Sequence, residues 1–133
     1  MFLNKLSLPE KEVFISLAMK AAEANGVVVE EEYSMIEEYC KEMGIAFFDA
    51  RNVKEIDDIV SFFKDSDLTS KKIILLEMIG LMYADGDYDE DEKKFVNIIA
   101  TGMGLTTEDI EKYDGFISKY IDLTKDIIDD MKL

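Results

Sequence analysis

The sequence predicts an all-helical protein, and three observations lead to this fold class. No sustained stretch alternates between apolar and polar residues, as a half-buried strand would. Only one proline occurs among the 133 residues, so little interrupts helix formation. Residues 13–45 also align without a gap on residues 73–105, at an offset of 60. A chain of this length favours a single domain over residues 1–133, large enough to bury a core without disulfides.

The internal repeat is carried by short motifs that stay in register. Ala24-Asn25-Gly26 aligns with Ala84-Asp85-Gly86, Glu30 and Glu32 with Glu90 and Glu92, and Met43-Gly44-Ile45 with Met103-Gly104-Leu105. We therefore expect a compact helical bundle of two pseudo-symmetric repeats. Repeat one covers about residues 6–64 and repeat two about residues 69–123, and a C-terminal helix extends to residue 133.

Each repeat is expected to open with a buried central helix. These helices cover roughly Pro9–Ala24 and Ser70–Ala84 and are apolar on most faces, which is typical of helices in the middle of a domain. Ser7 and Glu10 have the spacing of a capping box before the first. Thr69 is the expected N-cap of the second.

Helices are expected to end at four glycines, because glycine readily adopts the left-handed conformation that closes a helix. They are Gly26, Gly44, Gly86 and Gly104. The second helix of each repeat covers about Glu30–Met43 or Glu90–Met103. The apolar residue after its glycine, Ile45 or Leu105, fits a Schellman ending. Further helices are expected over Val53–Lys64, Thr107–Lys119 and Leu123–Met131.

The charge of the chain limits its partners. Fifteen basic and 30 acidic residues give a net charge of −15. A field of this sign repels phosphate backbones and anionic lipids, so we expect no nucleic-acid binding and no adsorption to such membranes. It favours solubility, cations and protein partners with a basic surface. The longest apolar run, residues 73–84, is too short to span a bilayer, and no signal peptide is recognised. We expect a cytoplasmic protein.

The lone cysteine, Cys40, cannot form an intramolecular disulfide. It aligns with Ala100 in the repeat, and a small residue at both places predicts a buried, unreactive thiol in a packed helix. The chain has no histidine. This removes Ser-His and Cys-His nucleophiles, most zinc sites and the usual general base.

The stretch from Asp85 to Glu92 holds six acidic side chains in eight residues. Asp89 and Glu92 have capping-box spacing, and acids in the first turn of a helix are favoured by its dipole. Asp85 and Asp87 are not explained in this way, because Asp85 lies near a helix C-terminus. Either the stretch is only the solvated end of one helix and the start of the next, or it is a weak Ca²⁺ or Mg²⁺ site. The candidate ligands are Asp85, Asp87, Asp89 and Glu92.

An EF-hand is excluded for this stretch. Counted from Asp85, position 6 is Glu90 and position 12 is Val96. A calcium loop of that class needs glycine at position 6 for its turn and glutamate at position 12 for bidentate ligation.

The duplicated Ala-Asp-Gly turn, the glutamate that opens the next helix and the glycine followed by leucine at its end resemble the tellurite-resistance TerB-like domain. The resemblance covers about residues 6–120. It implies an all-helical domain with an acidic cluster at the two turns and divalent-cation binding there. It also implies a link to tellurite and other stress responses, with partners at membranes or among chaperones. The first turn departs from the pattern, since Asn25, Val27 and Val29 align with Asp85, Asp87 and Asp89.

The sequence leaves three classes of function open. The leading hypothesis is a non-enzymatic, cation-binding or interaction module similar to TerB. A metal-assisted hydrolase with Mg²⁺ on the carboxylates of residues 85–92 is the second, although no lysine or arginine lies between Lys72 and Lys93 to stabilise developing charge. The third is a pure protein-interaction scaffold for a basic partner.

Overall fold

The computed structural model describes residues 1–24, 29–45, 53–84 and 88–133. These residues form one 3-10 turn and six α-helices: η1 (Leu3–Lys5), α1 (Leu8–Ala24), α2 (Val29–Met43), α3 (Ile56–Lys64), α4 (Leu68–Ala84), α5 (Glu90–Gly102) and α6 (Thr107–Met131). No strand occurs within these ranges. The all-helical prediction is therefore confirmed.

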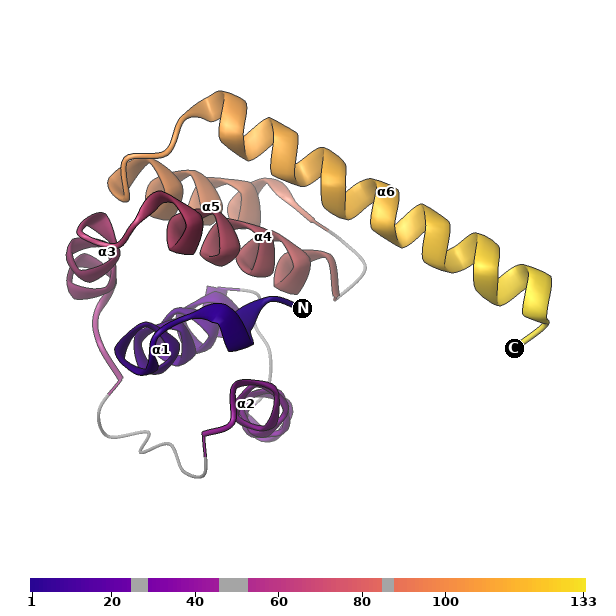
Figure 1. Cartoon of the computed structure of the whole chain (residues 1–133), viewed down its shortest axis with the longest axis horizontal. Coiled ribbons are helices and arrows are strands. Elements are labelled where there is room, and N and C mark those ends of the chain that lie inside the picture. The colour runs from indigo at the N-terminus through magenta and orange to yellow at the C-terminus, as the bar shows by residue number, and fades with distance from the viewer. Residues whose placement is uncertain (25–28, 46–52, 85–87) are drawn as a thin grey trace.

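Helices α1 and α4 form the centre of the bundle (Figure 1). Helix α1 contacts α2, α3, α4 and α5, while α4 also contacts α5, α6 and η1. Their apolar side chains supply most of the core, which includes Phe14, Ile15, Leu17, Ile74, Leu75, Met78, Ile79 and Met82. A helix that is apolar on most faces needs neighbours on several sides, and the central position provides them.

Helix α6 is one continuous helix of 25 residues, not the two shorter helices that we expected. The expected break between Lys119 and Leu123 contains no glycine or proline. Ile121 is half-buried against the core, and the Thr124 hydroxyl donates to the Tyr120 carbonyl at 2.8 Å, so the helix passes through this stretch. The first half of α6 packs on α4 and α5, and the second half projects away from the bundle (Figure 1).

Two helix starts also differ from the expectation. The carboxylate of Asp67, not Thr69, caps α4 by accepting from the Ser70 N–H at 2.7 Å. Helix α4 therefore begins at Leu68, the residue directly after its N-cap Asp67. Helix α3 begins three residues later than expected, because the Lys54 N–H donates to Ser16 Oγ of α1 at 3.1 Å before the helix starts.

Other helix ends confirm the sequence signals. The Ser7 N–H donates to Glu10 at 2.9 Å and Ser7 Oγ accepts from the Glu10 N–H at 3.3 Å, which completes the expected capping box of α1. Gly44 and Gly104 have φ of +72° and +93°. The N–H of the residue after each of these glycines, Ile45 or Leu105, donates to a carbonyl five residues earlier at 2.9 Å in both cases, as in a Schellman ending. Gly26 and Gly86 lie outside the described residues.

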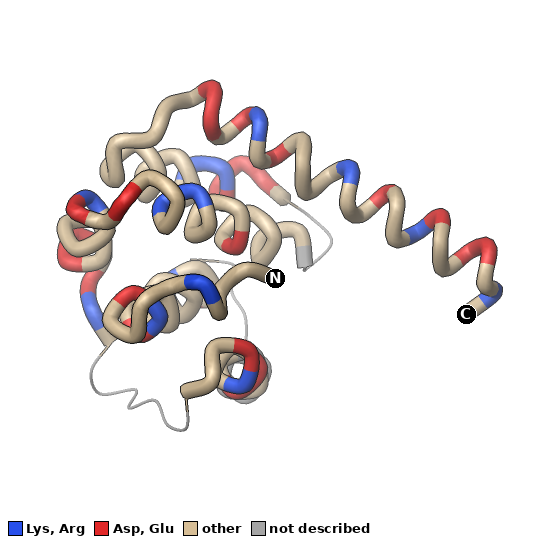
Figure 2. Tube along the Cα trace, viewed as in Figure 1, with Lys and Arg blue, Asp and Glu red and all other residues tan. Residues whose placement is uncertain are grey.

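The charged residues cover the outside of the bundle. Figure 2 shows acidic residues on every helix, with lysines and acids interspersed along α6. Within the described part of the chain, no helix is both long and apolar enough to cross a membrane.

Candidate functional site

The acidic stretch joins the end of α4 at Ala84 to the start of α5 at Glu90. Two of the four predicted cation ligands, Asp85 and Asp87, lie outside the described residues. The other two, Asp89 and Glu92, are described. Among the residues that the structure places, no three Cys, Asp or Glu side chains come close enough to share a metal ion. The described residues alone do not assemble the predicted cation site.

Asp89 and Glu92 form the predicted capping box at the start of α5. Asp89 Oδ1 accepts from the Glu92 N–H at 2.9 Å, and the Asp89 N–H donates to Glu92 Oε1 at 3.3 Å. The side chain of Asp89 is exposed, whereas Glu92 is only 4% exposed. The capping role of this pair is confirmed, and it leaves the exposed Asp89 carboxylate on the side of the turn that faces water.

Sequence reasoning missed Asp114, which comes from α6 to the same turn. Its carboxylate accepts a hydrogen bond from the phenolic hydroxyl of Tyr83, near the end of α4, at 2.5 Å. The hydrogen bond, followed by burial and the charge of Asp114, raises the pKa of Tyr83 to about 12. Asp114 aligns with Lys54 in the repeat register, so the repeat gives no hint of a carboxylate here.

Two tyrosine rings pack together across the ends of the turn. The centroids of Tyr83 and Tyr88 lie 5.0 Å apart with an interplanar angle of 53°. Tyr88 is half-buried, and this burial, followed by the charge of Asp114, raises its pKa. The two rings bring the last turn of α4 close to Tyr88, two residues before the start of α5.

Lys93 balances part of the local negative charge. Its Nζ lies 5.6 Å from the centroid of the Tyr88 ring and 3.6 Å from the carboxylate of Glu90, one turn earlier in α5. Both groups are largely exposed, so the ion pair contributes little to stability. The contact places a positive charge at the α5 side of the turn, while Asp114 lies at its α6 side.

A groove of about 680 Å³ lies beside this site, between α4 and α6. Its apolar lining includes Leu76, Leu81, Ile117 and Ile121, and its charged lining includes Glu42, Glu77, Asp122 and Lys125. A mainly apolar lining with a few charged groups is the usual composition of a binding groove.

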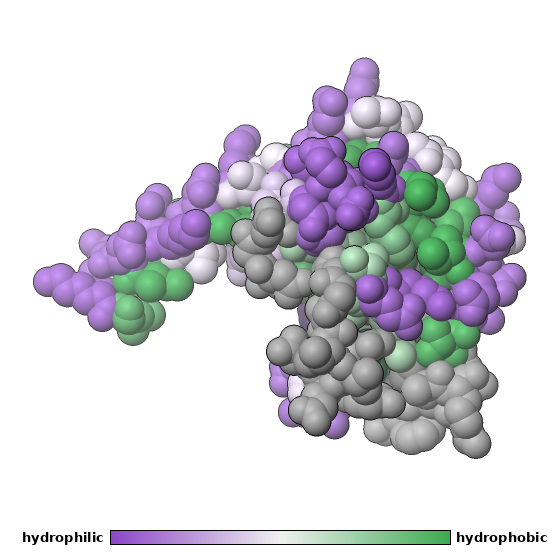
Figure 3. All heavy atoms as spheres, turned by 180° about the vertical axis from the view of Figure 1, so that it is seen from behind, coloured by the Kyte–Doolittle hydropathy of each residue, from purple (hydrophilic) through white to green (hydrophobic). Residues whose placement is uncertain are grey.

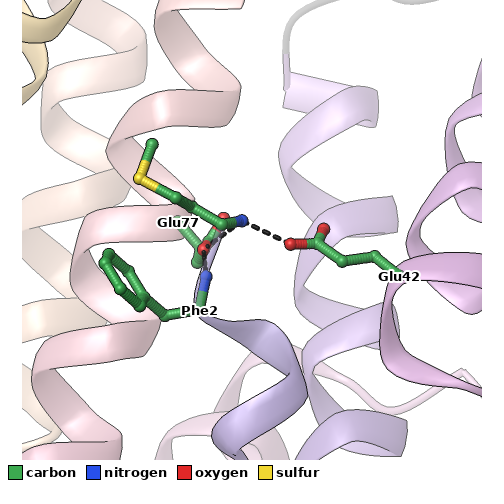
Figure 4. A network of polar contacts seen from close by, with 4 residues as sticks. Phe2, Glu42 and Glu77 are labelled. Atoms are coloured by element: carbon green, nitrogen blue, oxygen red, sulfur yellow. Dashed lines mark hydrogen bonds and ion pairs between the residues drawn. The ribbon is translucent and has the colours of Figure 1, made fainter.

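Met1 contributes to the lining of this groove. The amino group of Met1 bonds Glu42 of α2 and lies 2.7 Å from Glu77 of α4, and the Phe2 N–H donates to Glu77 at 2.6 Å (Figure 4). Partial burial would lower the pKa of this amino group, but the bonds and charges of the two glutamates outweigh it and raise the pKa. Met1 therefore links α2 to α4 at the groove.

Cys40 is half-buried at the end of α2 and packs against the core. The prediction of a buried thiol is therefore wrong, because Cys40 is only partly buried. The aligned Ala100 is fully buried. Burial, followed by the charge of Glu37, raises the pKa of the Cys40 thiol. A raised pKa reduces the thiolate fraction and agrees with an unreactive cysteine.

A comparison of the chain with known protein families finds no match, and comparisons with curated proteins and with solved structures find none either.

Proposed function

We propose that this chain is a non-enzymatic, TerB-like binding module that takes Ca²⁺ or Mg²⁺ at the turn between α4 and α5. In this proposal it works in the cytoplasm through a protein partner, in a response to tellurite or another stress. The observation that carries the cation-binding proposal is the position of Asp114. This carboxylate from α6 lies beside a turn that already contains Asp85, Asp87 and Asp89.

The electrostatic argument starts from like charges. Asp89 caps α5 and is stabilised by the helix N-terminus. The capping argument does not cover Asp85 and Asp87, and Asp114 adds a further carboxylate on the α6 side. Hard divalent cations prefer oxygen ligands from carboxylates and carbonyls. A cation held by Asp85 and Asp87, with Asp89 and Asp114 next to it, would offset this repulsion. Glu92 stays a predicted ligand, although its carboxylate is buried and takes part in the capping box.

We also propose the two-repeat architecture of a TerB-like domain. Helices α1 (Leu8–Ala24) and α4 (Leu68–Ala84) each have 17 residues and begin 60 residues apart. Helices α2 and α5 are each followed by a glycine with positive φ, Gly44 or Gly104, and these two glycines are 60 residues apart. The third helices of the two halves, α3 and α6, differ in length, with 9 and 25 residues. The repeat therefore has its best support in the first two helices of each half.

The test of cation binding is the melting temperature in millimolar CaCl₂ or MgCl₂. A ligand at 100 times its dissociation constant adds about 2.7 kcal/mol of stability, and a weak site adds less. We expect Asp85→Asn with Asp87→Asn to abolish the rise and Asp114→Asn to reduce it. Asp129→Asn, on the exposed far end of α6, is the matched control and should respond like the parent. Sodium chloride at equal ionic strength corrects for screening. If the Asp85 and Asp87 double variant responds like the parent, there is no specific site at this turn.

A second candidate function, a scaffold for a basic partner, is favoured by the groove. Glu42, Glu77 and Asp122 contribute to its lining beside apolar side chains. These charges complement a partner segment that carries lysine or arginine next to leucine or isoleucine. The test is the fluorescence anisotropy of a labelled amphipathic Leu/Lys helix. A peptide of the same composition without the helical pattern is the control, and equal binding of both would show adsorption to the acidic surface alone.

A further inference from the structure

An exposed apolar stripe runs along α6 on a side that the bundle does not cover. It consists of Phe116, Tyr120, Leu123 and Ile127, which are 48%, 53%, 58% and 45% exposed. Their spacing of four, three and four residues places them in one row on the helix. At about 1.5 Å per residue the row is roughly 17 Å long. We refer to these four residues as the α6 stripe.

The α6 stripe is distinct from the face of α6 that packs on the bundle. That face includes Ile117, which is buried, and Ile121, which is half-buried. At about 100° per residue, the stripe lies between roughly a quarter and a third of a turn around the helix from these two isoleucines. Figure 3 shows apolar side chains gathered on one side of the projecting end of α6, with hydrophilic ones on the other. Exposed rows of this kind mark interaction surfaces.

We infer that the α6 stripe packs against the α6 stripe of a second copy of this chain, with the two helices antiparallel. The spacing of four, three and four residues reads the same in both directions. A two-fold axis between residues 121 and 122 therefore places Phe116 opposite Ile127 of the second copy and Tyr120 opposite Leu123 of the second copy. Each layer pairs one aromatic ring with one branched aliphatic side chain. A two-fold interface requires such self-complementarity, which an unrelated partner does not require.

The charges beside the stripe select the antiparallel orientation. Lys119 and Asp126 lie seven residues apart on the same edge of the stripe, and both are exposed. In the antiparallel arrangement Lys119 faces Asp126 of the second copy, and Asp126 faces Lys119 of the second copy. In a parallel arrangement this edge would face the other edge of the second stripe, where Thr124 and Met131 offer no opposite charge to Lys119 and Asp126. Flanking charges of this kind set partner choice and orientation in helix pairs.

The local charge also fits a second copy better than a basic partner. Residues 119–132 contain three lysines and four aspartates, a net charge of −1 against −15 for the whole chain. The projecting part of α6 therefore carries little of the negative charge that would attract a basic surface. It is also the part of the chain where another copy meets the least local repulsion.

The size of the stripe predicts a weak dimer. Four side chains, each about half exposed, present on the order of 400 Å² of apolar surface per copy. The two copies together would bury roughly 800 Å², which is below the size of a standard stable interface and in the range of weak, transient ones. Repulsion between two copies of charge −15 acts over a longer range than the paired contacts, so added salt should strengthen association.

Sedimentation equilibrium of the intact chain, from about 10 µM to 1 mM, tests the inference. We expect a reversible monomer–dimer equilibrium that shifts towards dimer between 50 and 300 mM NaCl, a range chosen to vary screening. Leu123→Glu should weaken association at least tenfold. Ile98→Glu is the matched control, since Ile98 is 61% exposed on α5 and lies away from the stripe. Circular dichroism checks that both variants keep the fold.

A charge exchange tests the orientation. Lys119→Asp should weaken the dimer, because it places two aspartates opposite each other at both ends of the contact. The double variant Lys119→Asp with Asp126→Lys should restore it. Lys125→Asp changes the net charge as much as Lys119→Asp does, but Lys125 lies on the opposite side of α6, so this control should leave the equilibrium unchanged. A chain that stays monomeric up to 1 mM overturns the inference. So does a dimer that Leu123→Glu leaves intact, or one that Lys125→Asp disrupts and Lys119→Asp does not.

Discussion

The phenolic oxygen of Tyr83, in the last turn of α4, lies 2.5 Å from Oδ1 of Asp114, in the second turn of α6. This bond joins two helices at residues that are 31 positions apart in the sequence. It also fixes where a carboxylate lies beside the acidic turn, so its removal should affect both stability and the ionisation of Tyr83.

Tyr83→Phe should lower the free energy of unfolding by about 0.5–1.5 kcal/mol at neutral pH, the usual net contribution of a hydrogen bond. The pKa of Tyr83 in the folded protein is raised from 10.0 to about 12. A raised pKa means that folding favours the neutral phenol. This stabilisation is complete below pH 10 and is lost as the pH rises through about 12.

Urea unfolding between pH 8 and pH 12 measures this loss of stability with pH, which Tyr83→Phe should make less steep. Tyr120→Phe, at an exposed position of α6, is the control and should keep the parent profile. A Tyr83→Phe variant with the parent profile would show that the hydrogen bond does not form in solution.

Asp89→Ala should lower the free energy of unfolding by about 1 kcal/mol, the typical effect of losing an N-cap. The reason is that Asp89 accepts from the Glu92 N–H and also takes part in the reciprocal capping bond. Asp91→Ala removes an exposed charge from the same first turn without removing a cap, so it should have the smaller effect. Equal effects of the two changes would mean that the dipole alone, and not the cap, carries the stabilisation.

Gly102→Ala should destabilise the protein by about 1–3 kcal/mol, because overpacking forces its neighbours to shift. A Cβ at residue 102 would lie 2.5 Å from Cγ1 of Val60, in α3. Gly115→Ala, in α6, is the matched control, because no other group lies within 4 Å of its added Cβ. Alanine is the better helix former, so this control should gain about 0.5–1 kcal/mol.

A double-mutant cycle with Val60→Ala isolates the contact between α3 and α5. The double variant should be more stable than the sum of the single effects, because Val60→Ala removes the clashing methyl groups. Additive effects in chemical denaturation would show that the end of α5 does not lie against Val60.

Cys40 should react slowly with Ellman's reagent at pH 8 in the folded protein and much faster in urea. Its thiol is half-buried and its pKa is raised by burial and by Glu37. Glu37→Gln removes the neighbouring charge, lowers the pKa and should speed the native reaction. Glu38→Gln is the control, since this exposed neighbour is not a cause of the raised pKa. A native rate equal to the unfolded rate would contradict the packed position of Cys40.

The parts of the fold that local signals specify were predictable from the sequence. Capping boxes depend on residues three positions apart, so the pairs Ser7–Glu10 and Asp89–Glu92 could be recognised directly. The left-handed endings at Gly44 and Gly104 have a similarly local cause. Continuous apolar stretches predicted the buried helices α1 and α4 for the same reason.

The parts that depend on packing could not be predicted in this way. The break expected in α6 does not occur, because no residue between 119 and 123 forbids helix and Ile121 packs against the core. Asp114 reaches the acidic turn only because α6 lies along α4. The cap of α4 shows competition between near neighbours, since Asp67 and Thr69 both suit an N-cap and the carboxylate takes the position.

Because α6 is one unbroken helix, its two ends should move together as a rigid unit. Asp114 lies near one end of this helix, and Ile127 lies thirteen residues further along, which is roughly 20 Å at 1.5 Å per residue. With no glycine or proline between them except Gly115, a rotation of the helix at Asp114 would turn the exposed row at the far end by the same angle. Cation binding at the turn between α4 and α5 and pairing of the α6 stripe with a second copy would then act on the same rigid helix. Thermodynamic linkage requires any such coupling to be reciprocal. Cation binding would therefore change the free energy of dimer formation by the same amount as dimer formation changes that of cation binding.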